Sequence, residues 1–164
     1  MTVRHHQIVA ILILIVGLGV VTAWGRSTSI DPADVQAIRE RFQGHWVAEL
    51  AQAGEHRRAE GQAAEECRAE FDGKNVVFHH LIDGIEARGT FYLDRDVKKG
   101  WVDFKLDAGW VIGLYEVTGD RLTLCVNAFA LPERLGVPTR PRPRKIKAGD
   151  DRHLYVFRKV TTDR

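Results

Sequence analysis

The sequence predicts an all-β fold of about eight strands, arranged as an antiparallel up-and-down barrel behind one short helix. Apolar and polar residues alternate along most of the chain after Gly44, which is the pattern of half-buried strands. Turn pairs separate the strand segments at Asp72-Gly73, Asp83-Gly84 and Gly119-Asp120, and no helical pattern intervenes. Consecutive hairpins form an antiparallel sheet, and closure of eight short strands into a barrel removes both exposed edges.

The N-terminal residues 1–25 are predicted to direct export. Arg4 precedes an uncharged apolar run over 8–24, and small residues around Ala23 offer a cleavage site for a secretory signal. A single-pass anchor is the alternative, because the run is near the short end of the ~17–25 residues that span a bilayer. Both interpretations place the remainder outside the cytoplasm, either periplasmic or secreted, or held at a membrane by the N-terminal helix. A linker over 26–30 then leads into one domain over 31–160.

The domain is predicted to begin with a helix over 31–42. Asp31 is a typical N-cap, and Pro32 suits the first turn. Val35, Ile38 and Phe42 lie on one face of such a helix and would pack against the barrel.

The barrel itself is predicted over 44–160. Its strand segments are 45–50, 67–71, 76–78, 85–93, 101–106, 111–117, 122–126 and 154–159. The polar segment 52–66 is expected to be a loop or a surface helical turn. Gly89 and Gly113 fall inside strands, where glycine can mark the bends that barrel closure needs.

Five aromatic residues on these strands are candidates to line a ligand cavity. They are Phe71, Phe78, Phe91, Phe104 and Tyr115. An eight-stranded barrel holds either packed side chains or one small ligand, so the alternative is that the same rings form the core.

A Pro-rich loop over 132–147 is the strongest charge feature. It carries six basic residues and no acidic one between the first and last of them: Arg134, Arg140, Arg142, Arg144, Lys145 and Lys147. Prolines would hold the loop extended. Outside the cytoplasm it would meet anionic lipid headgroups, acidic polysaccharide or an acidic partner rather than nucleic acid, and the alternative is a solvated loop.

No catalytic constellation is visible. Serine occurs only at positions 27 and 29, in the linker, which excludes a serine triad built on the barrel. His79 and His80 are adjacent on a predicted strand, so their side chains would point to opposite faces, and no metal site or cofactor is expected. Cys67 and Cys125 have no CxxC spacing and form either one disulfide or two buried thiols.

Four segments together resemble a lipocalin-like domain family expanded in planctomycete bacteria. They are FQGHWV from Phe42, GTFYLD from Gly89, IGLYEVTGDRLTLCV from Ile112, and HLYVFRK from His153. The third is the most specific, and the resemblance extends over about 38–160. The chain departs from the family at Arg142, where RPRKI replaces a segment with an acidic member, so no role of that segment in relatives is carried over to this chain.

The resemblance implies a structural pairing that closes one end of the barrel. In lipocalins a Gly-x-Trp on the first strand packs its indole beneath an arginine of the last strand, and Gly44, Trp46 and Arg158 are similarly placed here. A guanidinium over an indole contributes about 0.5–2 kcal/mol.

These observations lead to three functional hypotheses. The first is an exported, non-enzymatic lipocalin-like protein that binds a small apolar ligand or a partner. The second is a cell-envelope interaction module that uses the basic loop, and the third is an uncharacterised enzyme.

Overall fold

The computed structural model describes residues 31–161, except 56, 82–83, 85 and 128–140. The predicted export segment 1–25 and the linker 26–30 therefore lie outside the described residues. Over the part of the chain that is described, no helix is long and apolar enough to cross a membrane.

The first element is the helix α2 (Pro32–Phe42), as the sequence predicts. Its N-cap, Asp31, accepts a hydrogen bond from the Ala33 backbone N–H at 2.9 Å through a side-chain oxygen. The helix ends at Phe42, which is completely buried. Phe42 thereby anchors an otherwise largely exposed helix to the barrel.

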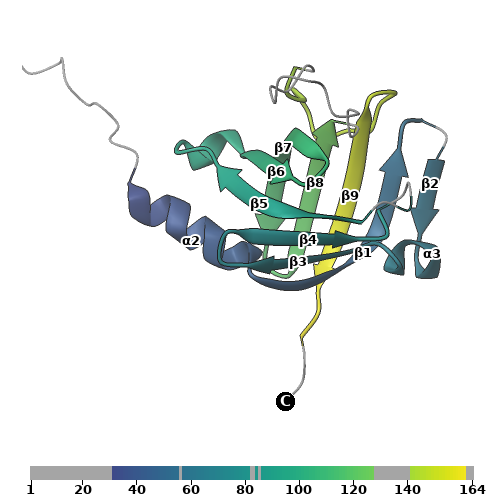
Figure 1. The fold of residues 1–164 in the computed structure, drawn as a ribbon, viewed down its shortest axis with the longest axis horizontal. Helices are drawn as coiled ribbons and strands as arrows, with labels where there is room; N and C mark the ends of the chain where they lie inside the picture. Colours follow the sequence, from purple (N-terminus) through teal and green to yellow (C-terminus); the bar gives the residue numbers. More distant parts are fainter. Residues whose placement is uncertain (1–30, 56, 82–83, 85, 128–140, 162–164) are drawn as a thin grey trace, which may run out of the picture. The chain divides into compact units, whose positions relative to one another are not determined.

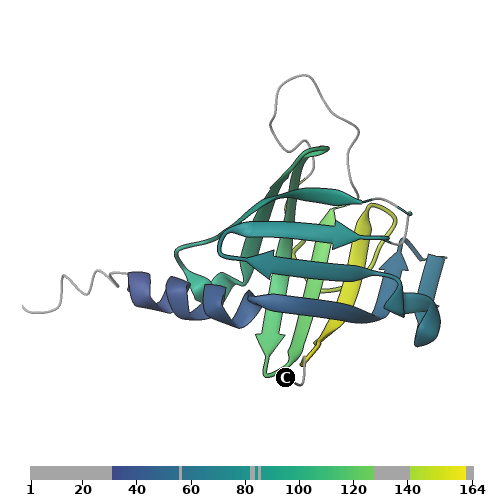
Figure 2. The same ribbon diagram turned by 60° about the horizontal axis from the view of Figure 1, so that its bottom comes forward.

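Eight antiparallel strands form the predicted closed barrel (Figures 1 and 2). They are β1 (Gly44–Ala53), β3 (Arg68–Asp72), β4 (Asn75–His79), β5 (Ala87–Leu93), β6 (Trp101–Leu106), β7 (Gly109–Thr118), β8 (Arg121–Asn127) and β9 (Arg152–Lys159). Each strand from β3 to β9 pairs with its neighbour in the chain, and β9 pairs with β1 to close the ring. A short 3-10 helix, η1 (Val97–Lys99), lies between β5 and β6.

The segment after β1 contains more regular structure than its sequence predicts. It forms β2 (Arg57–Glu60), which pairs only with the second half of β1, and then the helical turn α3 (Gln62–Glu65). The helical turn is confirmed, but β2 was missed because its two arginines and one glutamate give it almost no apolar pattern. A β-bulge between Ala48 and Leu50 shifts the register of β1 against β9.

Two ends of the barrel are distinguished below. The helix end is where α2 enters, and it also holds the turn at 73–74, the loop over 94–100 and the turn at 119–120. The loop end is the opposite rim, where β1 and β6 finish at Ala53 and Leu106 and where β5 and β9 begin.

Gly89 and Gly113 lie where neighbouring strands approach closely. A Cβ atom at Gly89 would overlap the Lys105 carbonyl oxygen, and one at Gly113 would lie 2.7 Å from the Cys125 carbonyl oxygen. Neither position tolerates a side chain without movement of the adjoining strand, which agrees with the role in barrel closure that the sequence suggests.

Candidate functional site

The five aromatic residues predicted to line a cavity all point into the barrel and are at most 7% exposed. Phe71, Phe91 and Tyr115 surround Phe42 of α2, with ring centroids 5.1–5.3 Å from it. Phe78 bridges toward the loop end, with its centroid 6.2 Å from Phe71 and 5.3 Å from Phe104. The rings thus pack mainly against one another as core, which is the alternative that the sequence left open.

The inner wall changes character toward the loop end. There small or aliphatic side chains share the inward positions with Phe78 and Phe104, which lie opposite Ala87 and Val111. The small or aliphatic residues are Ala53, Ala87, Leu106, Val111 and Val126. One polar side chain, His153, shares this wall, is 6% exposed, and has its Nδ1 3.4 Å from the Tyr155 hydroxyl. His153 is not among the site residues that the sequence predicts. Its place in the alternation with Tyr155 and Phe157 was the available signal.

The closure of the helix end differs from the expectation by one residue. Lys159, not Arg158, lies over Trp46, with its Nζ 5.3 Å from the ring. The cause is the alternation of side chains along a strand, because successive residues point to opposite faces. In the register of the two strands Trp46 lies opposite Lys159, and Arg158 lies opposite Val47. Arg158 therefore points outward, where its Nε lies 3.5 Å from Glu49 Oε1. Gly44 precedes this pair with φ of +106°, a conformation that favours glycine where the chain turns from α2 into β1.

Residues 141–149, called the strap below, run along the outer wall. Arg142 anchors the strap by donating to the carbonyl oxygens of Val102 at 3.1 Å and Gly113 at 2.7 Å, and by pairing with Asp103 at 2.5 Å. Its guanidinium also lies 4.8 Å from the centre of the Trp101 ring. Arg142 was predicted to face an anionic partner. The structure corrects this, since the side chain is only 20% exposed and its hydrogen bonds are made to the barrel.

Two residues of β8 hold the rest of the strap against the outer wall, and three cations of the strap remain exposed to solvent. Asn127 donates to the Pro141 carbonyl at 3.1 Å, and Cys125 Sγ is 3.4 Å from the Lys147 carbonyl oxygen. Three predicted partner-binding residues are exposed and make no ion pair with any described side chain: Arg144, Lys145 and Lys147. The other two predicted residues of this loop, Arg134 and Arg140, lie outside the described residues.

Both cysteines are buried free thiols, so the disulfide considered from the sequence is not formed. Burial raises the pKa of Cys67 to about 11, with a further contribution from the Glu66 carboxylate. Burial also raises the pKa of Cys125, against the lowering effect of its hydrogen bond to the backbone of Lys147. Protonated, buried thiols are poor nucleophiles, which argues against cysteine catalysis.

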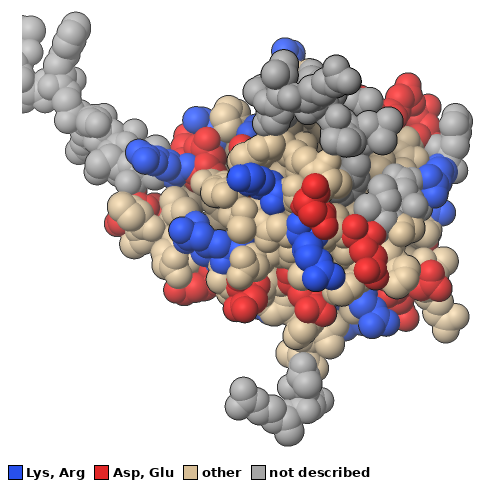
Figure 3. Space-filling model, in the orientation of Figure 1, with Lys and Arg blue, Asp and Glu red and all other residues tan. Residues whose placement is uncertain are grey.

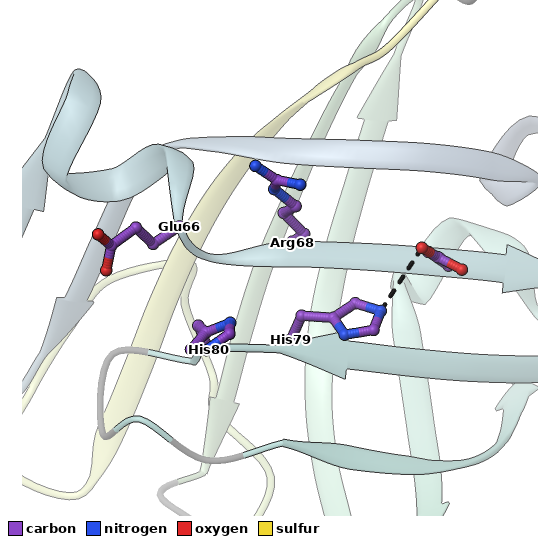
Figure 4. Close-up of a pocket in the computed structure, with 5 residues that line it drawn as sticks. Glu66, Arg68, His79 and His80 are labelled. Atoms are coloured by element: carbon purple, nitrogen blue, oxygen red, sulfur yellow. Dashed lines mark ion pairs between the residues drawn. The ribbon is translucent and has the colours of Figure 1, made fainter.

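A polar pocket of about 480 Å³ lies on the outer wall of β3 and β4 (Figure 4). Glu66, Arg68, Glu70, His79 and His80 line it. The two histidines were expected on opposite faces, but both line this pocket. His79 ends β4, and His80 then adopts φ of +47°, so the alternation of the strand stops between them.

His79 is held between two carboxylates in this pocket. Its Nε2 lies 3.5 Å from Glu70 Oε1, and its Nδ1 lies 3.9 Å from Glu86 Oε1. Such an arrangement orients an imidazole, but among the described residues no serine or cysteine lines the pocket to act as nucleophile. Within the described ranges, no three His, Cys, Asp or Glu side chains are grouped so that they could hold a metal ion.

Comparison with known proteins adds no assignment. Scans against protein-family models, curated proteins and solved structures found no match to this chain.

Proposed function

We propose that this protein is an extracytoplasmic, non-enzymatic binding protein of the lipocalin-like family noted above, and that it holds a small apolar ligand inside the loop end of its barrel. The closed eight-stranded antiparallel barrel supports this proposal, because barrels of this size accommodate one small ligand.

The distribution of side-chain volume along the barrel favours the loop end as the binding region. Aromatic rings fill the helix end, whereas the loop end combines alanine, valine and leucine with one His-Tyr pair and with Phe78 and Phe104, which lie opposite Ala87 and Val111. A mainly apolar wall with few polar groups is the usual lining of small-molecule sites, where the polar groups fix the orientation of the ligand.

Titration with the apolar fluorophore N-phenyl-1-naphthylamine tests this proposal. We expect saturable fluorescence enhancement by the wild-type protein and its loss in Ala87→Leu, because the added side chain would project from the buried wall into the barrel interior at the loop end. Arg88→Leu, the outward neighbour on the same strand, is the matched control and should bind like wild type. Circular dichroism would establish that both variants are folded. Equal probe binding by the two variants, or none by the wild type, contradicts the proposal.

A second function is favoured by the three exposed cations of the strap. Arg144, Lys145 and Lys147 are free of acidic partners among the described residues, and the anchors at Arg142 and Asn127 fix the backbone that presents them. On the described surface drawn in Figure 3, by contrast, acidic and basic side chains are interspersed. We propose that the strap contacts an anionic envelope component.

Sedimentation with vesicles containing phosphatidylglycerol tests the second function. Wild-type binding should weaken steeply between low and physiological salt, because exposed charges are screened. Replacement of the three strap cations by glutamine should abolish it, while glutamine at Arg57, Arg58 and Arg68 should have little effect. Binding that is independent of salt, or equal in the two triple variants, rules the strap out.

A further inference from the structure

A second pocket on the outer wall carries a further inference. It has a volume of about 430 Å³ and lies at the helix end of β5 and β6. The residues used in the argument are Tyr92, Asp94, Arg95, Trp101, Asp103 and Arg142. The pocket is separate from the barrel interior, so the inference does not depend on the proposed apolar ligand.

Exposed aromatic rings are the first feature of this pocket. Tyr92 is 45% exposed and Trp101 is 36% exposed, and both count among the few large apolar side chains on the described surface. Tyr92 is held in place: the Trp110 ring lies 5.7 Å away at 31°, and the Thr90 hydroxyl donates to the Tyr92 hydroxyl at 3.2 Å. A fixed, exposed ring gives a binding surface that loses little conformational entropy on contact.

Trp101 has a different part in the pocket. Lys99 Nζ lies 4.7 Å from its ring centre, and the Arg142 guanidinium lies 4.8 Å from it. These cations occupy positions over the indole, so we assign Trp101 to positioning Arg142 rather than to stacking on a ligand. Tyr92 is then the ring that remains for a ligand.

The charges lining the pocket balance. Two carboxylates, Asp94 and Asp103, and two guanidinium groups, Arg95 and Arg142, line it. Arg142 is paired with Asp103, and Lys99 Nζ lies 3.9 Å from Asp94 Oδ1. Arg95, by contrast, is exposed and makes no hydrogen bond or ion pair with another described residue. A balanced pocket offers both donors and acceptors but little net charge, which disfavours a phosphate or another compact anion.

The shape and the chemistry together favour one ligand class. We propose that this pocket binds a sugar ring of an oligosaccharide, with a C–H face on Tyr92 and hydroxyl groups hydrogen-bonded to Asp94, Asp103 and Arg95. A pocket of this volume is of small-ligand size, whereas a protein partner needs about 800 Å² of matched surface on each side. A sugar ring combines an apolar face with many hydroxyl groups, which is what an exposed ring surrounded by charge-balanced side chains would recognise.

Titration of the full-length protein with cellotetraose, chitotetraose and tetragalacturonic acid tests the proposal, with tryptophan fluorescence as readout because Trp101 lies in the pocket and Trp110 beside it. We expect at least one of these probes to give a saturable signal with a dissociation constant below about 10 mM. Preference for tetragalacturonic acid would indicate that Arg95 binds a carboxylate, and preference for a neutral probe that it binds hydroxyl groups.

Variants then locate the binding. Tyr92→Ala should weaken it about tenfold or more, and Tyr92→Phe should stay within about threefold of wild type because the ring remains. Arg95→Ala should weaken binding, and Lys98→Ala, another exposed cation nearby, should not. Saturation-transfer NMR on the sugar protons gives a readout independent of any change in the protein's own fluorescence. Absence of saturable binding for all three probes, or binding that Tyr92→Ala leaves unchanged, overturns the proposal.

Discussion

Lys159 on the last strand lies directly opposite Trp46 on the first, and its ammonium group is 5.3 Å from the centre of the indole ring. The pair joins the two ends of the folded chain at the helix end of the barrel. Trp46 also donates from Nε1 to the Phe42 carbonyl at 2.7 Å, so the same indole connects α2, β1 and β9. Trp46 is completely buried, which makes this junction part of the core.

Replacement of Lys159 should therefore matter more than replacement of its neighbour. We expect Lys159→Ala to lower the free energy of unfolding by about 0.5–2 kcal/mol through loss of the cation–π contact and stem packing. Arg158→Ala removes only an exposed pair with Glu49 and should cost at most about 0.5 kcal/mol. Urea denaturation followed by fluorescence measures both. If Arg158→Ala loses more stability than Lys159→Ala, the result would contradict the Lys159 contact and favour the arginine pairing expected from the lipocalin resemblance.

The strap depends on Arg142. Arg142→Ala should lower the free energy of unfolding by about 1.5–3 kcal/mol, since it removes charged hydrogen bonds to the Val102 and Gly113 carbonyls. Loosening of the strap should also speed the reaction of Cys125 with a thiol reagent, because Lys145 and Lys147 carbonyls cover its sulfur. Arg144→Ala, an exposed cation of the same strap, is the control. If the two variants are equally stable and equally reactive, the strap is not anchored through Arg142.

Stability should fall in alkaline solution partly because of Cys67. Its pKa is about 11 in the folded protein and near 9.0 in an exposed thiol, so its contribution is complete below pH 9. Between pH 9 and 11 the unfolded chain loses the proton first, and the contribution disappears. Cys67→Ala should make the decline shallower without abolishing it, because the pKa values of Tyr115 and Cys125 are also raised. Urea midpoints measured from pH 8 to 10.5 test this, and identical slopes for variant and wild type would contradict it.

The hydroxyl of Tyr115 is buried and has no hydrogen-bond partner among the described residues. Tyr115→Phe should therefore leave stability unchanged or raise it by about 1 kcal/mol, because an unsatisfied polar group is removed from the core. Tyr155→Phe provides the comparison, since its hydroxyl lies 3.4 Å from His153 and its loss should cost about 0.5–1.5 kcal/mol. Thermal melts of both variants measure the difference. A marked loss of stability in Tyr115→Phe would show that this hydroxyl is satisfied.

Alternation and turn chemistry were sufficient to predict most of the fold. The strands, the short helix and the closed antiparallel barrel follow from apolar residues at every second position and from Asp-Gly turns. The strand β2 could not be found this way, because its side chains are charged and it is held by backbone hydrogen bonds to β1. A pattern of apolar and polar side chains cannot predict a strand that is held by backbone hydrogen bonds alone.

The candidate sites were less predictable, because they depend on which side of the wall a residue faces and on what lies over it. The resemblance gave the right cluster at the helix end but the wrong cation, since one step along β9 exchanges the inner and outer faces. Arg142 appeared from its sequence to be one of six equivalent cations, and only its contacts with β6 and β7 distinguish it. The pocket around Tyr92 brings together residues from β5, β6 and the strap, which no local sequence pattern could indicate.

The pairing of β1 with β9 has a consequence for how the chain reaches its native state. The two strands are separated by almost the whole domain, so their contact is among the most non-local in the molecule. Such pairings slow folding, because the entropy of a long loop is lost before any hydrogen bond is gained. Until β9 is synthesised, β1 and β8 are unpaired edges that invite aggregation. Newly made chains should accordingly need protection by chaperones up to the last strand, and truncation before Arg152 should give aggregates rather than a smaller soluble barrel.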